Sequence, residues 1–149
     1  MVRKGKPFEK ILVAVDGSKQ SSNAAQLAAR LAETQGGELV VLHVMDRMVI
    51  EEMEKLMGQT PKALERELEE QAWALLHSTE ILLKGYGVPL KLVLKEGTPY
   101  QQIIKTAEEE KVDLIVMGKL GERGLKKVLM GSAVFRVMEF SSIPVLVVS

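Results

Sequence analysis

Short apolar runs alternate with longer amphipathic stretches along the whole chain. The first run reads Ile-Leu-Val-Ala-Val, and near-continuous apolar runs of this length are typical of strands buried on both faces of a sheet. One later run alternates leucines with Lys91 and Lys95, which predicts a strand with one more polar face. We predict strands over residues 11–15, 38–44, 90–95, 112–117 and 143–148.

The stretches between these strands carry apolar residues at helical spacing and are bounded by residues that favour helix ends. Ser18 is placed to cap the first helix, and Gly36-Gly37 is placed to stop it. Thr98-Pro-Tyr-Gln101 has the spacing of a capping box. We predict helices from Ser18 to Gly36, from Pro61 to Gly85, from Thr98 to about Glu110 and from Gly131 to Phe140.

The stretch from Met45 to Gln59 is the irregular connection of the chain, and it holds four methionines. Val49, Met53 and Met57 are spaced to form a helical stripe. One interpretation is a helical connection whose methionines pack on the domain. The other is an adaptable lid or partner surface, because methionine repacks easily. The sequence leaves both open.

The alternation of apolar strands with helices predicts an α/β fold, with one open five-stranded parallel sheet covered by helices on both faces. A chain of 149 residues fits one domain, and no internal repeat or low-complexity linker divides it. We therefore assign residues 1–149 to a single domain.

Composition narrows the possible function classes. Lys plus Arg and Asp plus Glu both number 20, so the chain lacks the basic excess that is usual in nucleic-acid-binding proteins. Cysteine is absent, which excludes disulfides and thiolate chemistry, and two histidines leave little for a histidine metal site. No stretch approaches the roughly 20 apolar residues of a membrane-spanning helix, and no signal segment is visible. We expect a cytoplasmic protein with no nucleic-acid or membrane partner.

The strongest chemical signal follows the predicted strand 112–117. Gly118 comes directly after that strand, where it would allow a sharp turn and the close approach of a ligand. Gly131-Ser132 opens the last helix, whose free N–H groups suit a phosphate, and the loop between is locally basic. Neither the Walker pattern nor the dinucleotide Gly-x-Gly-x-x-Gly pattern is present. A phosphate-binding loop and a surface loop with solvated lysines both fit these residues.

The pattern Gly118-x2-Gly121-x9-Gly131-Ser132 resembles the nucleotide-binding motif of universal stress proteins in their ATP-binding branch. The strand ending in Asp16-Gly-Ser and the closing Ile-Pro-Val-Leu-Val-Val also resemble that family, so the resemblance extends over nearly the whole chain. It implies the sheet order 3-2-1-4-5 of adenine nucleotide alpha hydrolase-like, Rossmann-like proteins. Lys119-Leu120 depart from the family pattern, because small polar or histidine residues are frequent there.

In that order strands 1 and 4 are neighbours from which the chain leaves in opposite directions, and a crevice opens at such a switch point. Asp16 ends strand 1 and Gly118 ends strand 4, so both would line the crevice. Alternatively, Asp16 is a turn residue at the start of the first helix, and the two roles are compatible.

The resemblance implies ATP as the ligand, with Mg²⁺ or Mn²⁺ accompanying it and no side chain assigned to the metal. It places adenine near Val15 and Val44, ribose near Asp16 and Met117-Gly118, and the phosphates at the glycine motif. The implied ATP-binding residues are Ala14, Val15, Asp16, Val44, Met117, Gly118, Lys119, Gly121, Gly131, Ser132, Ala133 and Val134.

Three functions from different classes stay open. The first is an ATP-binding stress-response module that acts as a nucleotide-dependent switch with slow or no hydrolysis. The second is an enzyme on the same pocket, with weak ATPase, phosphotransfer or autophosphorylation activity. The lack of an evident base paired with an activated nucleophile weighs against it. The third is a nucleotide-free interaction protein, against which the intact glycine motif weighs. We interpret the remaining candidates as packed or surface residues: His43, His77, Trp73 and Phe140.

The last predicted strand lies at a sheet edge in the order 3-2-1-4-5. Its residues are apolar on both faces and carry no charge that would block pairing with another chain: Val145, Leu146, Val147 and Val148. We expect a homodimer through antiparallel pairing of this strand, as the resemblance also implies. The opposite edge, with Lys91 and Lys95, should stay free, and an unidentified protein partner remains compatible with a switch.

Overall fold

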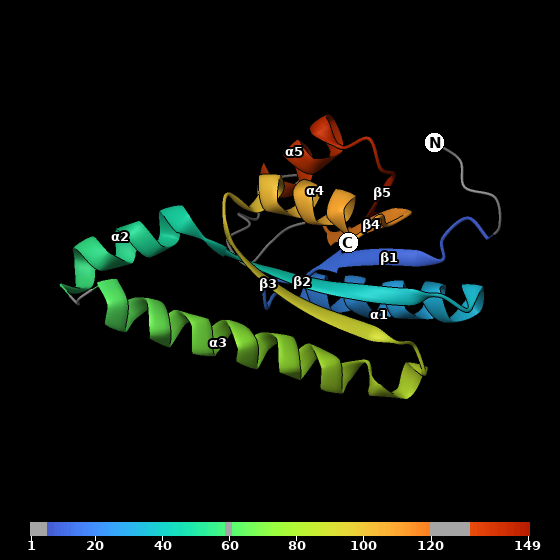
Figure 1. Cartoon of the computed structure of the whole chain (residues 1–149), viewed down its shortest axis with the longest axis horizontal. Helices are drawn as coiled ribbons and strands as arrows, with labels where there is room; N and C mark the ends of the chain where they lie inside the picture. Colours follow the sequence, from blue (N-terminus) through green and yellow to red (C-terminus); the bar gives the residue numbers. More distant parts are fainter. Residues whose placement is uncertain (1–5, 59–60, 120–131) are drawn as a thin grey trace.

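The centre of the computed structural model is a five-stranded parallel sheet in the order β3-β2-β1-β4-β5 (Figure 1). The structure describes residues 6–58, 61–119 and 132–149. All strand pairings in the sheet are parallel, and the strand order that the resemblance implies is confirmed. The strands are β1 (Lys10–Ala14), β2 (Glu38–Asp46), β3 (Leu90–Gly97), β4 (Leu114–Gly118) and β5 (Val145–Val148).

Helices cover both faces of the sheet, as predicted. α1 and α3 lie on one face, and α4 and α5 lie on the other (Figure 1). Each face has its own apolar cluster, with Val13 and Val41 on the α1 side and Leu12 and Val40 on the α4 side. The helices are α1 (Lys19–Gln35), α2 (Arg47–Met57), α3 (Pro61–Leu82), the short 3₁₀ helix η1 (Lys84–Tyr86), α4 (Pro99–Glu109) and α5 (Ser132–Phe140).

The predicted helix boundaries are confirmed at both ends of α1. The Ser18 hydroxyl accepts a hydrogen bond from the Ser21 N–H at 3.1 Å, and Gly36 ends the helix in the left-handed conformation with φ +64°. The capping box predicted at Thr98 does not form. α4 does begin there, but the Thr98 side chain makes no capping hydrogen bond to the helix, and the Thr98 backbone carbonyl accepts one from the Gln102 N–H at 3.0 Å.

The last strand is shorter than predicted because a turn precedes it. The Ser141 hydroxyl accepts from the Ile143 N–H and donates to the Ile143 carbonyl, both at 2.9 Å. Residue 143 is therefore held in the turn, and β5 begins at Val145. β5 lies at one edge of the sheet and β3 at the other, so the edge position predicted for the closing strand is confirmed.

The irregular connection contains the helix α2, which extends beyond the sheet together with the first part of α3 (Figure 1). Its Ile50 is buried, whereas Met48 is 69% exposed and Met57 is 52% exposed. The helical interpretation of this segment is confirmed, but packing accounts for only part of its methionines. Among the residues that the structure describes, no helix is both long and apolar enough to cross a membrane.

Candidate functional site at the carboxyl ends of strands 1 and 4

The central strand β1 lies between β2 and β4, and the chain leaves β1 and β4 toward opposite faces of the sheet. α1 follows β1 and packs in one apolar cluster, while α5 belongs to the other. The carboxyl ends of β1 and β4 are thus the topological switch point of this sheet, where open α/β sheets bind their ligands. The structure places Asp16 and Gly118 at these carboxyl ends, as the sequence predicts.

An apolar cluster at the carboxyl ends of the strands comes from three strands and one helix. Its residues share the cluster on the α4 and α5 face of the sheet: Ala14, Val44, Met117, Ala133 and Val134. Val15 does not share it. Its side chain is buried on the opposite face, in the cluster that contains α1. The predicted wall of Val15 with Val44 is therefore wrong as a side-chain surface, and Ala14 takes the place of Val15 beside Val44.

Asp16 starts the turn that leads from β1 into α1. Its Oδ1 atom accepts a hydrogen bond from the Ser18 N–H at 3.0 Å, which is an Asx turn. Its own N–H donates to Ser21 Oγ at 3.2 Å, and Ser21 Oγ donates to the Ser18 carbonyl. The alternative role of Asp16 as a turn residue is confirmed. A carboxylate held in this way keeps a fixed position beyond the carboxyl end of β1.

Gly118 ends β4 directly against the first turn of α1. A Cβ atom on Gly118 would lie 2.9 Å from the Gln20 carbonyl carbon and 3.0 Å from the Ser21 nitrogen. Gly118 is absent from the glycines with positive φ, so the expected sharp turn does not explain it. The close approach that the structure shows at this glycine is that of α1, and the predicted contact of Gly118 with a ligand stays a prediction.

The phosphate side of the predicted site is described only in part. Lys119 is half-buried, and its N–H donates to the Val148 carbonyl at 2.7 Å, which extends the pairing of β4 with β5. Ser132 begins α5 and is exposed, while Val134 is buried. The first-turn N–H groups of a helix lack partners within the helix, so the start of α5 suits an anion. Gly121 and Gly131 lie outside the described residues.

The sequence did not identify two residues near the carboxyl ends of the strands as contributors to a site. His43 of β2 is half-buried, and its Nδ1 lies 2.6 Å from the Val15 carbonyl oxygen. Ser21 of α1 is buried and binds the backbone of Asp16. The sequence identified His43 as a packed or surface residue, which is correct, but strand register was needed to show what it contacts. The other three candidates are at least partly exposed: His77, Trp73 and Phe140.

The clearest electrostatic feature lies at the opposite end of the sheet. The hydrogen bond from Lys91 Nζ to Glu110, at 2.8 Å, is the main factor that lowers the Glu110 pKa, and the charges of Lys91 and Lys10 add to it against the effect of burial. Within residues 6–58, 61–119 and 132–149, no group of three or more His, Cys, Asp or Glu side chains could hold a metal ion.

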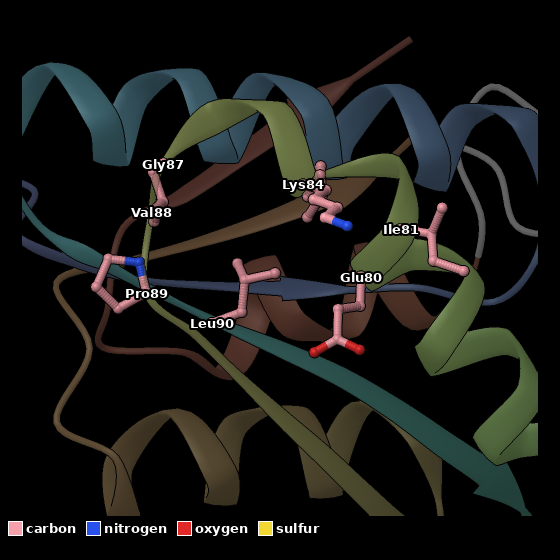
Figure 2. A pocket seen from close by; sticks show the side chains of 8 residues that line it. Glu80, Ile81, Lys84, Gly87, Val88, Pro89 and Leu90 are labelled. Atoms are coloured by element: carbon pink, nitrogen blue, oxygen red, sulfur yellow. The ribbon is translucent and has the colours of Figure 1, made fainter.

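A shallow groove of about 610 Å³ also lies away from the switch point, beside the start of the edge strand β3 (Figure 2). The end of α3 and the segment that leads into β3 form its sides, and their charged side chains include Glu80 and Lys84. Leu90 is the first residue of β3, so the groove opens at the amino end of the strands. It is therefore separate from the switch point at the carboxyl ends of β1 and β4.

A doubly wound α/β protein with its topological switch point at the carboxyl ends of the central strands is the class that these features define. The chain belongs to the universal stress protein family, because the model of that family matches residues 7–149. It is 33% identical over 147 residues to the universal stress protein YxiE of Bacillus subtilis, covering 95% of this chain and 99% of YxiE.

Solved structures of the family share the fold. The protein MJ0577 of Methanocaldococcus jannaschii superposes with a TM-score of 0.84 at 31% identity, and the match covers 96% of each chain. A universal stress protein in complex with cAMP has a TM-score of 0.69 at 22% identity, with 95% of this chain and 97% of that chain covered. One from Archaeoglobus fulgidus in complex with dAMP has a TM-score of 0.67 at 21% identity, with full coverage of both.

Proposed function

We propose that this protein binds ATP at the carboxyl ends of β1 and β4 and acts as a nucleotide-dependent switch in a stress response. The observation that carries the proposal is the meeting of two kinds of surface at the switch point. The apolar cluster of Ala14, Val44 and Met117 suits a base, and it continues into Ala133 and Val134 of α5, the helix whose first turn suits a phosphate.

The comparisons support an adenine nucleotide as the class of ligand. Family members with cAMP and with dAMP bound share this fold along the whole chain. ATP rather than a monophosphate is favoured by the glycine motif, whose Gly121, Gly131 and Ser132 would surround a phosphate chain. Mg²⁺ or Mn²⁺ would then enter with the triphosphate, coordinated mainly by its oxygens.

We assign the protein slow hydrolysis or none. At the switch point, the Asp16 carboxylate accepts from Ser18 and the His43 imidazole is bound to a backbone carbonyl. Neither contact places a base beside an activated nucleophile. Turnover of ATP within the ordinary enzymatic range of about 1–1,000 per second, lost on substitution of a residue at this edge, would contradict the switch.

The proposal includes a homodimer formed through the free edge of β5. Val145 and Val147 point toward one apolar cluster and Leu146 and Val148 toward the other, so the strand is apolar on both faces. Two such edges related by a two-fold axis could pair antiparallel and remove both from solvent.

One experiment tests the nucleotide proposal directly. The purified protein is denatured, and any released nucleotide is identified by mass spectrometry. Calorimetric titration of the ligand-free protein with ATP, GTP and tripolyphosphate follows. We expect ATP to bind more tightly than tripolyphosphate, because tripolyphosphate has no base to contact the apolar cluster. Equal binding of all three would exclude a base pocket, and no binding of any would overturn the proposed function.

A further inference from the structure

The peptide group between Val15 and Asp16 is held at both of its polar atoms by side chains. Its carbonyl oxygen is 2.6 Å from Nδ1 of His43 in β2, and its N–H donates to Ser21 Oγ in α1 at 3.2 Å. Val15 and Ser21 are each 4% exposed, so water has little access to either. This peptide is therefore fixed between two neighbouring elements at the end of the central strand.

The register of the sheet explains how the His43 side chain reaches this carbonyl. Regular pairing of β1 with β2 ends at Ala14 and Leu42, and the Val15 N–H still donates to the Leu42 carbonyl at 2.8 Å. The Val15 carbonyl lies beyond this pairing. His43 is the next residue along β2, and its side chain lies on the same face as that of Val41 because residues two apart in a strand share a face. From there its ring contacts the carbonyl.

The chemistry of the contact defines the state of the ring. A carbonyl oxygen can only accept a hydrogen bond, so Nδ1 carries the proton and donates it. The bond compensates for the burial of a carbonyl that would otherwise lack a partner. A donor at this place also restricts rotation of the peptide, and that rotation would move the backbone from which both Ala14 and Asp16 present their side chains.

We propose that His43 is a positioning residue of the nucleotide site, which orients the Val15–Asp16 peptide through its Nδ1–H. This inference rests on the proposed function and extends it to a residue that does not itself touch the ligand. It assigns a role to the donor atom, not to the bulk or charge of the ring.

Two substitutions of His43 separate the donor from the shape of the side chain. His43→Leu removes the donor and puts an apolar side chain of similar length in its place. His43→Asn keeps an N–H donor the same number of bonds from Cα as Nδ1. His77→Leu is the matched control, because His77 is exposed on α3 and contacts Trp73 and Glu80 rather than the strand ends.

Calorimetry with ATP gives the first readout. We expect His43→Leu to weaken binding about tenfold, which corresponds to about 1.4 kcal/mol. His43→Asn should remain within about threefold of the wild type, and His77→Leu should bind ATP as the wild type does. Circular dichroism establishes that each variant is folded before titration. If His43 only filled space, asparagine would not restore binding, because it fills less space than leucine.

Nuclear magnetic resonance of the nucleotide-free protein gives a second, independent readout. The imidazole nitrogen shifts of His43 should report a proton on Nδ1, and the Asp16 amide should exchange faster with solvent in His43→Leu but not in His43→Asn or His77→Leu. Unchanged ATP affinity in folded His43→Leu, or failure of asparagine to restore binding, would overturn the role of His43 while leaving nucleotide binding intact. A wild type that binds no nucleotide would instead overturn the proposed function, and the role of His43 with it.

Discussion

Gly118 at the end of β4 packs against the backbone of Ser21 in the first turn of α1, so closely that a Cβ atom would lie 3.0 Å from the Ser21 nitrogen. The neighbouring Gln20 carbonyl carbon would be 2.9 Å away. Both are backbone atoms, which cannot move aside as the end of a flexible side chain can. The contact therefore sets the distance between β4 and α1. Ser21 in turn accepts the hydrogen bond of the Asp16 N–H, so this distance also affects the position of Asp16.

Gly118→Ala is expected to destabilise the protein by about 1–3 kcal/mol, the usual range for an added carbon in a closely packed region. The displaced first turn of α1 should also weaken ATP binding. Urea unfolding measures the first effect and calorimetry the second. Gly85→Ala is the control, because no atom of the described residues lies within 4 Å of a Cβ added there and its φ is not positive. If the two variants are equally stable, Gly118 does not have the packing role assigned to it.

The sequence predicted the elements well because each leaves a local signal. The apolar run 11–15 and the closing run 143–148 became β1 and β5 with ends shifted by one or two residues. The shift at β5 comes from the Ser141 turn, a side-chain contact that apolar patterning does not reveal. The strand order came from resemblance to a family, and patterning alone would not have supplied it.

The candidate site was harder to predict because it depends on register between strands. Alternation shows that Ala14 and Val15 face opposite sides, but not which of them shares a side with Val44. The pairing of Ala14 with Leu42 decides it in favour of Ala14. The same register brings His43 to the Val15 carbonyl. The reason for Gly118 was missed for a similar cause, since the approach of α1 is a tertiary contact.

Val44→Asp should weaken ATP binding at least about tenfold, or about 1.4 kcal/mol. It places a negative charge on the apolar surface proposed for the base and near an anionic ligand. Val93→Asp is the matched control, because Val93 lies half-buried in the same cluster but beside Leu42, partway along β3 rather than at the carboxyl ends of β1 and β4. Both variants are expected to lose stability, and only Val44→Asp to lose affinity. Equal ATP affinities, measured by calorimetry on folded protein, would remove Val44 from the site.

Glu110→Gln tests the ion-pair group at the amino end of the sheet. Lys91 and Lys10 lower the folded-state pKa of Glu110, so the carboxylate contributes stability above its ordinary pKa of 4.5 and loses this contribution as the pH falls through the lowered value. Near neutral pH the substitution should cost up to about 1 kcal/mol, the upper range for partly exposed pairs. At a pH below the folded-state pKa the wild type and the variant should unfold at the same temperature.

Glu108→Gln is the control for this experiment, since Glu108 is exposed on α4, which ends just before Glu110, and its side chain forms no ion pair with any residue that the structure describes. Differential scanning calorimetry across the acid range measures both variants. A stability difference between wild type and Glu110→Gln that persists at low pH would show that the substitution acts through packing rather than through charge.

Val147→Pro should convert the proposed homodimer to a monomer without loss of the fold. The N–H groups of Ile115 and Lys119 donate to the carbonyls of Pro144 and Val148. The backbone N–H and carbonyl groups of the even-numbered residues of β5 therefore face β4. Val147 is odd-numbered, so its backbone N–H faces away from β4. A proline is tolerated at such a position of an edge strand, but it has no N–H to donate to a partner strand. Val147→Ala shortens the side chain but keeps the N–H, so it should remain dimeric. Light scattering at tens of micromolar protein decides between them. A wild-type monomer, or a folded Val147→Pro dimer, would show that β5 is not the interface.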